Sequence, residues 1–188
     1  MRLAVLASGT GSIYQAIIDA NIDVAAVLVD RACGVIDVAN ASGIPCLVVE
    51  RTDFGPDFDR NRFSRDVVTA LTAADIDVVA MAGFGTVLSA PFFEAFEGRV
   101  LNTHPALLPS FSGWHGVRDA LRHGVKITGC TVHIATLEVD AGPILAQAAI
   151  EILADDDEAS LHERIKSTER HLYPATIKKF LADLETHT

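Results

Sequence analysis

An asparagine and a histidine separated by one residue, Asn102 and His104, are the side chains best suited to chemistry. They end an apolar run that predicts a buried strand, and the alternation of side chains along a strand places both on the same side. A histidine beside an amide donor can move a proton and support a developing oxyanion. From residue types alone, a capping asparagine and a packed histidine at a strand end are the favoured interpretation.

A glycine-rich segment, Ala7–Ser12, lies between an apolar run and a helical pattern. Glycine lets the backbone approach a ligand closely, and a helix N-terminus attracts anions, so the segment predicts a phosphate site. Two alternatives stay open. Gly9 and Gly11 with Asp30 resemble part of a dinucleotide fingerprint, although Tyr14 occupies the third glycine position. The second alternative is a tight turn that binds no ligand.

The first hundred residues alternate apolar runs with helical patterns. Such alternation predicts a parallel sheet covered by helices on both faces, with ligands at the carboxyl ends of its strands. We expect strands at Leu3–Ala7, Val24–Val29, Cys46–Val49, Val78–Ala82 and Val100–Thr103, and helices at Ser12–Ala20, Gly34–Ser42 and Asp57–Ala74.

The pattern changes after His104. A loop rich in proline, serine and glycine precedes a short helix, a hairpin of two strands and a long amphipathic helix, and we expect Pro174 to kink or divide that helix because proline lacks the N–H group. The whole predicts one α/β domain with a Rossmann-like, mostly parallel sheet extended by a C-terminal β-hairpin and long helix. The expected ranges are Pro105–Trp114 for the loop, His115–His123 for the short helix, Thr128–Ala135 and Ile144–Ile150 for the hairpin, and Glu158–Leu184 for the long helix.

Composition narrows the function. The net charge of −10 argues against nucleic acid as a partner, which would require a basic face. No apolar stretch is long enough to span a membrane, and the N-terminus lacks the layout of a signal peptide. The three cysteines, Cys33, Cys46 and Cys130, and the histidines lack the spacing of metal ligands, so we expect no metal and a reducing, cytoplasmic location.

The run Leu-Asn-Thr-His-Pro-Ala-Leu-Leu-Pro at residues 101–109 resembles the motif of the formyltetrahydrofolate-dependent transferases, and most of all that of the glycinamide ribonucleotide formyltransferases. The resemblance covers nearly the whole chain. It implies one formyltransferase domain over residues 1–188, with 1–100 as the phosphate-binding half and 101–188 as the catalytic and folate-binding half. The blocks that agree are Ala82–Phe84, Gly113–Gly116, Thr128–His133, Val139–Ile144, Glu163–Ile165, Glu169 and Tyr173-Pro174.

The resemblance implies direct transfer of the formyl group of 10-formyltetrahydrofolate, as co-substrate, to the amine of glycinamide ribonucleotide in purine synthesis. Asn102 would support the oxyanion, His104 would act as general acid or base, and Asp140 would pair with His104. From the residues alone, Asp140 is a turn former. The implied substrate-binding residues are Gly11, Ser12, Ile13, Lys166 and Glu169; those for folate are Arg60, Gly85, Thr86, Val87, Leu88, Asn102, Thr136, Leu137, Glu138, Val139 and Asp140.

The sequence departs from the family in a few places. Ile13 stands where asparagine is usual, Gly85-Thr86 replaces methionine followed by a basic residue, and Tyr14 is bulkier than the common leucine. A different amine, such as an amino-sugar nucleotide, and a non-catalytic folate- or nucleotide-binding module therefore remain alternatives. A methionyl-tRNA formyltransferase is disfavoured by the acidic charge and the lack of a second domain, and a formyltetrahydrofolate hydrolase by the lack of a regulatory domain. A homodimer is left open.

Overall fold

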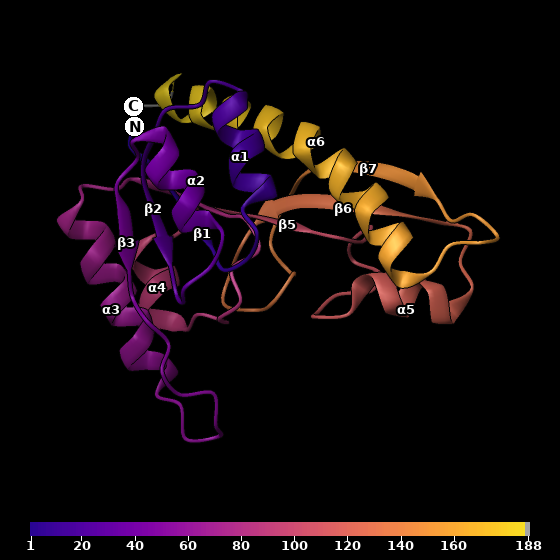
Figure 1. Ribbon diagram of the computed structural model, residues 1–188, viewed down its shortest axis with the longest axis horizontal. Coiled ribbons are helices and arrows are strands. Elements are labelled where there is room, and N and C mark those ends of the chain that lie inside the picture. Colours follow the sequence, from indigo (N-terminus) through magenta and orange to yellow (C-terminus); the bar gives the residue numbers. More distant parts are fainter. Residues whose placement is uncertain (187–188) are drawn as a thin grey trace. The chain divides into compact units, whose positions relative to one another are not determined.

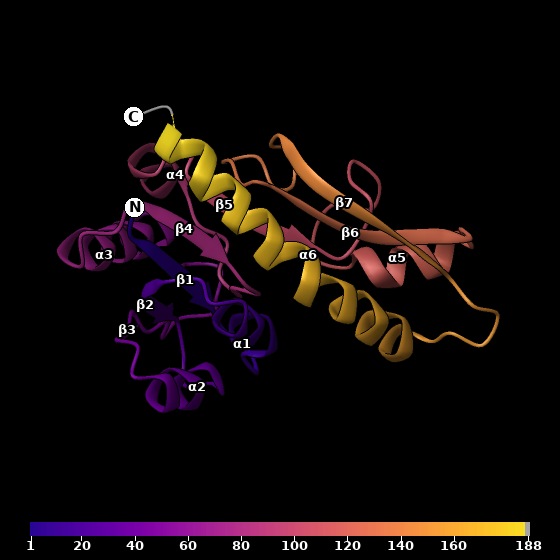
Figure 2. The same ribbon diagram turned by 90° about the horizontal axis from the view of Figure 1, so that it is seen from above.

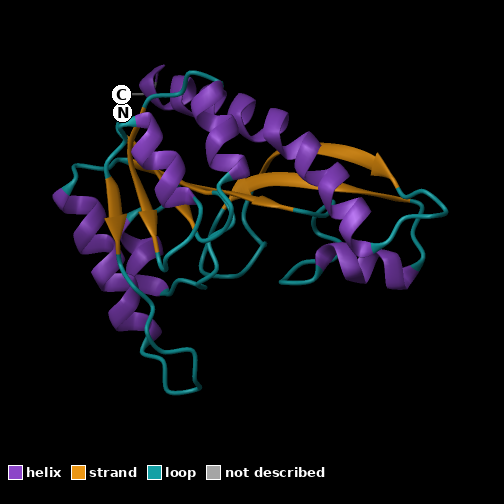
Figure 3. Cartoon of the chain, in the orientation of Figure 1, coloured by secondary structure: helices purple, strands orange, loops and turns teal. Residues whose placement is uncertain are grey.

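The computed structural model describes residues 1–186 (Figures 1 and 3). Its seven strands follow the order β3-β2-β1-β4-β5-β6-β7 in one mostly parallel sheet, which confirms the predicted α/β fold. The chain divides into two compact units, Met1–Val100 and a second that begins at Leu101. No helix among the described residues is long and apolar enough to cross a membrane.

The first unit is a parallel sheet of four strands. Its strands are apolar on both faces, and every residue of the first strand is buried, which explains their continuous apolar runs. The strands are β1 (Leu3–Ala7), β2 (Val24–Val29), β3 (Cys46–Val48) and β4 (Val78–Met81), and the helices are α1 (Ser12–Asp19), α2 (Val35–Ser42), α3 (Arg60–Ala73) and α4 (Ala90–Ala95).

Helices cover both faces of this four-stranded sheet. The chain moves outward from β1 to β3 and then returns to β4, so right-handed crossovers put α1 and α2 on one face and α3 and α4 on the other. Figure 2 shows this division. The sequence did not predict α4, because six residues carry too little periodicity; it is held by the buried Phe92 and begins with Pro91 in its first turn.

The second unit contains the predicted hairpin and long helix. β5 (Val100–His104), which begins at the boundary, pairs antiparallel with β6 (Ile127–Ile134), and β6 pairs antiparallel with β7 (Ile144–Glu151). The helix α5 (Gly116–His123) and the long helix α6 (Glu158–Thr186) complete the unit. Leu161 and Ile165 of α6 pack with Val117 of α5 and Cys130 of β6 in a common core.

Of the two predicted effects of Pro174, a kink or a division of the long helix, division is wrong, since α6 continues through it to Thr186. Its buried stripe repeats every four residues as Leu161, Ile165, Glu169, Tyr173 and Ile177. The Tyr173 hydroxyl also donates a 2.9 Å hydrogen bond to the Leu101 carbonyl of β5. These tertiary contacts offset the roughly 3 kcal/mol that an internal proline costs.

Gly142, in the turn between β6 and β7, lies where no other residue fits. A Cβ atom there would come within 1.8 Å of the Ile134 carbonyl oxygen. We therefore predict that Gly142→Ala lowers the free energy of unfolding by about 1–3 kcal/mol, because the turn must move to make room. Urea unfolding measures this, with Gly9→Ala as the control, since a Cβ at Gly9 meets nothing within 4 Å. Equal midpoints for the two variants would contradict the close approach.

Candidate active site

Two adjacent strands of the second unit place the central side chains. In the β5–β6 ladder, Asn102 lies directly opposite His133, and His104 lies opposite Thr131. Asn102 and His104 are two residues apart and so share one face of β5, as the sequence predicted. The amide nitrogen Nδ2 of Asn102 lies 3.2 Å from Nε2 of His133. Antiparallel pairing thus adds to the predicted pair a histidine 31 residues away in sequence.

Asp140 joins this group from the turn between β6 and β7. Its backbone has a φ of 58°, a left-handed conformation that aspartate tolerates better than most residues. One carboxylate oxygen, Oδ2, accepts a 2.7 Å hydrogen bond from the Gly113 N–H and lies 3.3 Å from Nδ1 of His104. The other, Oδ1, lies 3.5 Å from Nε2 of His133. Asp140 is therefore both a turn former and a partner of two histidines.

Burial and hydrogen bonding oppose each other at Asp140, whose side chain is 6% exposed. Burial raises the pKa of the carboxyl group, but the neighbouring His133 ring, the hydrogen bond from the Gly113 N–H and the neighbouring His104 ring outweigh it and hold the pKa below its usual value. The carboxylate is consequently ionised at neutral pH and can orient the His104 ring through Nδ1.

The other ring nitrogen of His104 contacts the loop that follows β5. Nε2 lies 2.8 Å from the Phe111 carbonyl oxygen, and Phe111 has a φ of 56°. The loop is anchored by the buried Thr131 hydroxyl, which donates to the Ala106 carbonyl at 2.7 Å and accepts from the Leu108 N–H at 3.0 Å. His104, with its side chain 6% exposed, is thereby fixed at both nitrogens by acceptor oxygens.

A buried acid lies on the opposite face of β5. Glu169 of α6 is 5% exposed, within the apolar stripe of that helix, and accepts a 2.7 Å hydrogen bond from the Thr103 hydroxyl. Burial raises the pKa of Glu169 above its usual value, although the Thr103 hydrogen bond and the charges of Lys166 and Arg170 lower it in part. A buried carboxyl group with a raised pKa is a recognised mark of a functional site.

In the first unit, the glycine-rich loop has the geometry predicted for an anion site. Gly11 adopts a φ of 86° at the N-cap of α1, and no side chain caps that helix. The first turn, which contains Ser12 and Ile13, therefore offers backbone N–H groups to an anion. Ile13 is 9% exposed, so its side chain belongs to the core and only its N–H group is available to a ligand.

The predicted folate loop of the first unit lies beside this glycine-rich loop. The Ser8 hydroxyl accepts a 2.6 Å hydrogen bond from the Gly85 N–H, and the Ser8 N–H donates to the Gly83 carbonyl at 3.0 Å. Ser89 then ties the loop to α3, with its hydroxyl 3.3 Å from the Arg60 carbonyl. Arg60 itself is an exposed first residue of α3, Val87 is exposed, and Thr86 and Leu88 are buried.

Asp30 is the acid that would bind a ribose in the dinucleotide interpretation, but protein groups already bind its carboxylate. Its buried carboxylate accepts hydrogen bonds from Nε of Arg31 at 2.9 Å and from the Thr86 hydroxyl at 2.7 Å. Burial raises the pKa of Asp30, but these bonds and one from Ser8 outweigh it and lower the pKa. A ribose would have to displace the Arg31 ion pair, so this geometry speaks against the dinucleotide.

The described structure thus brings together Asn102, His104 and Asp140, and separately joins the loops that contain Gly11 and Gly85. His133, the Phe111 carbonyl and the Gly113 N–H complete the first group, and no local sequence signal identifies the two backbone groups. In the second unit, the predicted folate segment is Thr136 to Asp140. Only its last residue, Asp140, belongs to the first group, and the four residues before it are mostly exposed.

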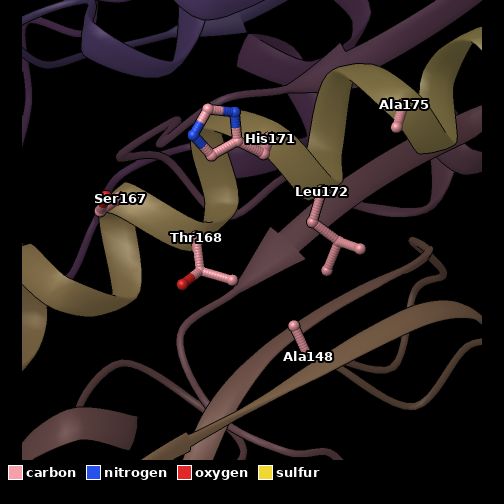
Figure 4. A pocket seen from close by; sticks show the side chains of 6 residues that line it. All are labelled: Ala148, Ser167, Thr168, His171, Leu172 and Ala175. Atoms are coloured by element: carbon pink, nitrogen blue, oxygen red, sulfur yellow. The ribbon is translucent and has the colours of Figure 1, made fainter.

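A pocket of about 410 Å³, lined by none of the predicted site residues, lies between α6 and β7, where Leu172 and Ala148 face each other (Figure 4). Its lining residues are Ala148, Ser167, Thr168, His171, Leu172 and Ala175. Within residues 1–186, no group of three or more histidine, cysteine or acidic side chains is arranged to hold a metal ion.

Known proteins are similar to this chain in sequence and in fold. Residues 1–177 match the formyl transferase family. The chain is 48% identical to a phosphoribosylglycinamide formyltransferase of Mycobacterium tuberculosis, over 99% of the chain and 86% of the relative. It is 42% identical to the trifunctional purine biosynthetic protein adenosine-3 of Drosophila melanogaster, over 94% of the chain but 14% of that protein.

The solved structures agree with the sequence comparison. Glycinamide ribonucleotide transformylase 1 from Symbiobacterium toebii superposes with a TM-score of 0.89 at 38% identity, covering 96% of this chain and 87% of that one. Sequence and fold therefore lead to the same conclusion. The chain belongs to the formyl transferase family, among relatives that are phosphoribosylglycinamide formyltransferases.

Proposed function

We propose that the protein transfers the formyl group of 10-formyltetrahydrofolate to the amine of glycinamide ribonucleotide in purine synthesis. The observation that carries this proposal is a cluster of side chains in a member of the formyl transferase family: Asp140 lies 3.3 Å from His104 and 3.5 Å from His133, and His133 lies 3.2 Å from Asn102. The free thiols Cys33, Cys46 and Cys130 support a reducing, cytoplasmic location for the reaction.

The proposed reaction needs no covalent enzyme intermediate. The substrate amine attacks the formyl carbon, a C–N bond forms, and the carbonyl oxygen becomes an oxyanion. The Asn102 amide donates a hydrogen bond to this oxyanion. The bond from the formyl carbon to N10 of the folate then breaks, while one proton leaves the attacking amine and one reaches N10.

His104 is the proposed carrier of those protons. Its Nδ1 lies 3.3 Å from the Asp140 carboxylate, which fixes the ring, so Nε2 is the nitrogen left to act on the reacting groups. Nε2 now faces the Phe111 carbonyl oxygen at 2.8 Å and must exchange that acceptor for the substrate.

We assign the binding residues from the resemblance to the formyltransferase family. The uncapped first turn of α1, with the N–H groups of Gly11, Ser12 and Ile13, suits a phosphate. Lys166 and Glu169 suit the remaining polar groups of the nucleotide. The residues assigned to folate are Arg60, Gly85, Thr86, Val87, Leu88, and Thr136 to Asp140.

The departures from the family bear on the choice of amine. The space beside Gly85 is taken by Arg31, whose Nη2 atom would lie 3.1 Å from a Cβ atom at residue 85. A guanidinium therefore lies next to this loop, although it is ion-paired with Asp30 and Thr86 is uncharged.

A turnover assay tests the proposal. The protein is mixed with 10-formyltetrahydrofolate and glycinamide ribonucleotide, and the absorbance change of the folate is followed. We expect saturable turnover that requires both compounds. Binding of folate without turnover for any amine would support a non-catalytic binding module instead.

Glu169 gives a prediction that separates binding from stability. Because its pKa is raised, its favourable contribution to folding is complete below the unfolded pKa of about 4.3 and is lost as the pH rises through the folded value. Glu169→Gln should therefore raise the Tm at pH 7 by a few degrees, on the order of 2–4 °C, and leave it unchanged near pH 4. The same variant should raise the KM for the nucleotide.

Thermal unfolding at the two pH values provides the measurement, with Glu163→Gln on the same helix as the control. A hydrogen bond from Arg170 lowers the pKa of Glu163, so its replacement should not raise the Tm at pH 7. A lower Tm for Glu169→Gln than for the wild type at pH 7 would contradict this account of Glu169.

A further inference from the structure

His133 is the most completely buried histidine next to the catalytic group, with a side chain that is 1% exposed. Each of its ring nitrogens has a defined neighbour. Nδ1 lies 3.0 Å from the Ile134 carbonyl oxygen, and Nε2 lies 3.2 Å from Nδ2 of Asn102. The reaction described above gives this residue no role.

The two neighbours determine where the ring proton lies. A carbonyl oxygen can only accept, so Nδ1 of His133 must carry the proton that points to Ile134. In the neutral ring, Nε2 is then an acceptor and requires a donor. The Nδ2 group of Asn102 supplies that donor, which leaves its second N–H free.

The alternative arrangement would turn the amide around. If Nε2 of His133 also carried a proton, it would donate to Oδ1 of Asp140, 3.5 Å away, and Asn102 would have to present its oxygen. An amide oxygen repels an oxyanion, whereas an amide N–H stabilises it. The state of one ring nitrogen therefore selects which end of the Asn102 amide can face the reaction.

We propose that His133 is a positioning residue for formyl transfer: as the Nδ1–H tautomer, it accepts a hydrogen bond from Asn102 and keeps an amide N–H of Asn102 free for the oxyanion. The inference rests on the proposed function, since it deepens the role of Asn102 there. It also links the two strands of the site, because Asn102 and His133 are directly opposed in the β5–β6 ladder.

Two substitutions separate the two hydrogen bonds of His133. His133→Asn keeps a donor near the Nδ1 position for Ile134 but removes the acceptor for Asn102. His133→Gln does the reverse. We expect His133→Asn to lower kcat by about 100-fold with KM within about twofold, and His133→Gln to stay within about tenfold of the wild type.

A double mutant shows whether His133 acts through Asn102. In an Asn102→Ala background, His133→Asn should lower kcat by no more than about twofold further, because its partner is already gone. A purely structural role would instead lower kcat by the same factor in both backgrounds, with a matching loss of Tm. That result, or a near-normal kcat for His133→Asn, would overturn the proposal.

Nitrogen-15 NMR of the wild-type protein gives a readout that needs no turnover. The expected spectrum has a protonated Nδ1 and an unprotonated Nε2 in His133, and the unprotonated signal should respond to Asn102→Ala. A proton on Nε2 in the resting protein would overturn the proposal. Absence of turnover with glycinamide ribonucleotide would overturn only the proposed function, because the NMR result stands apart from it.

Discussion

Replacing His104 with alanine is expected to lower kcat for formyl transfer by about 10²- to 10⁴-fold. The ring is the proton carrier of the proposed reaction, and its Nδ1 lies 3.3 Å from the Asp140 carboxylate, which orients it. The KM values should change little, since the ring acts as protons move and not in binding. Steady-state kinetics with both substrates varied gives the two constants.

His171→Ala serves as the control for this variant. His171 is an exposed histidine of α6 that lines the pocket in Figure 4 and has no role in the proposed reaction. It should turn over like the wild type. Near-normal turnover of His104→Ala would contradict the assignment of His104 as the proton carrier.

Replacing Asp140 with asparagine should have the second-largest effect, a loss of kcat of about 10²- to 10³-fold. An amide in place of the carboxylate removes the charge that lies 3.3 Å from His104 and 3.5 Å from His133. It also leaves one oxygen for the Gly113 N–H and the histidines together. The His104 ring then loses the partner that fixes its orientation.

The same substitution should change how stability depends on pH. The pKa of Asp140 is lowered in the folded protein, so the carboxylate stabilises the fold above the unfolded pKa of about 3.9, and this contribution is lost as the pH falls through the folded value. The Tm of Asp140→Asn should therefore lie below that of the wild type at pH 7, and the two should converge at acidic pH.

Asp155→Asn is the matched control, because Asp155 is an exposed acid outside the site. Its Tm should follow that of the wild type at each pH. A constant Tm difference between Asp140→Asn and the wild type from pH 7 to about pH 3 would contradict the ionised Asp140 described above.

Much of the fold could be predicted because its strands are buried on both faces. Runs such as Leu3–Ala7 and Val24–Val29 are continuously apolar and coincide with β1 and β2. The α4 helix was missed because it is short, and the continuity of α6 through Pro174 was missed because the contacts that hold it are tertiary. Local patterns contain no information about such contacts.

In the candidate site, too, some residues could be predicted from local patterns and others depend on contacts between distant parts of the chain. Asn102 and His104 could be paired from the alternation along one strand. The role of Asp140 required the resemblance to a family, since its spacing alone indicates a turn, and the structure shows that the turn and the ion pair coexist. The partnership of His133 with Asn102 depends on the register between β5 and β6, which no spacing within one strand reveals.

The most direct test of the central claim is a competition for the formyl group. The protein receives 10-formyltetrahydrofolate with equal amounts of glycinamide ribonucleotide and an amino-sugar nucleotide, and mass spectrometry identifies the products. The account predicts formylated glycinamide ribonucleotide as the dominant product, with its formation lost in His104→Ala. Formylation of the amino sugar alone, or of neither amine, would contradict it.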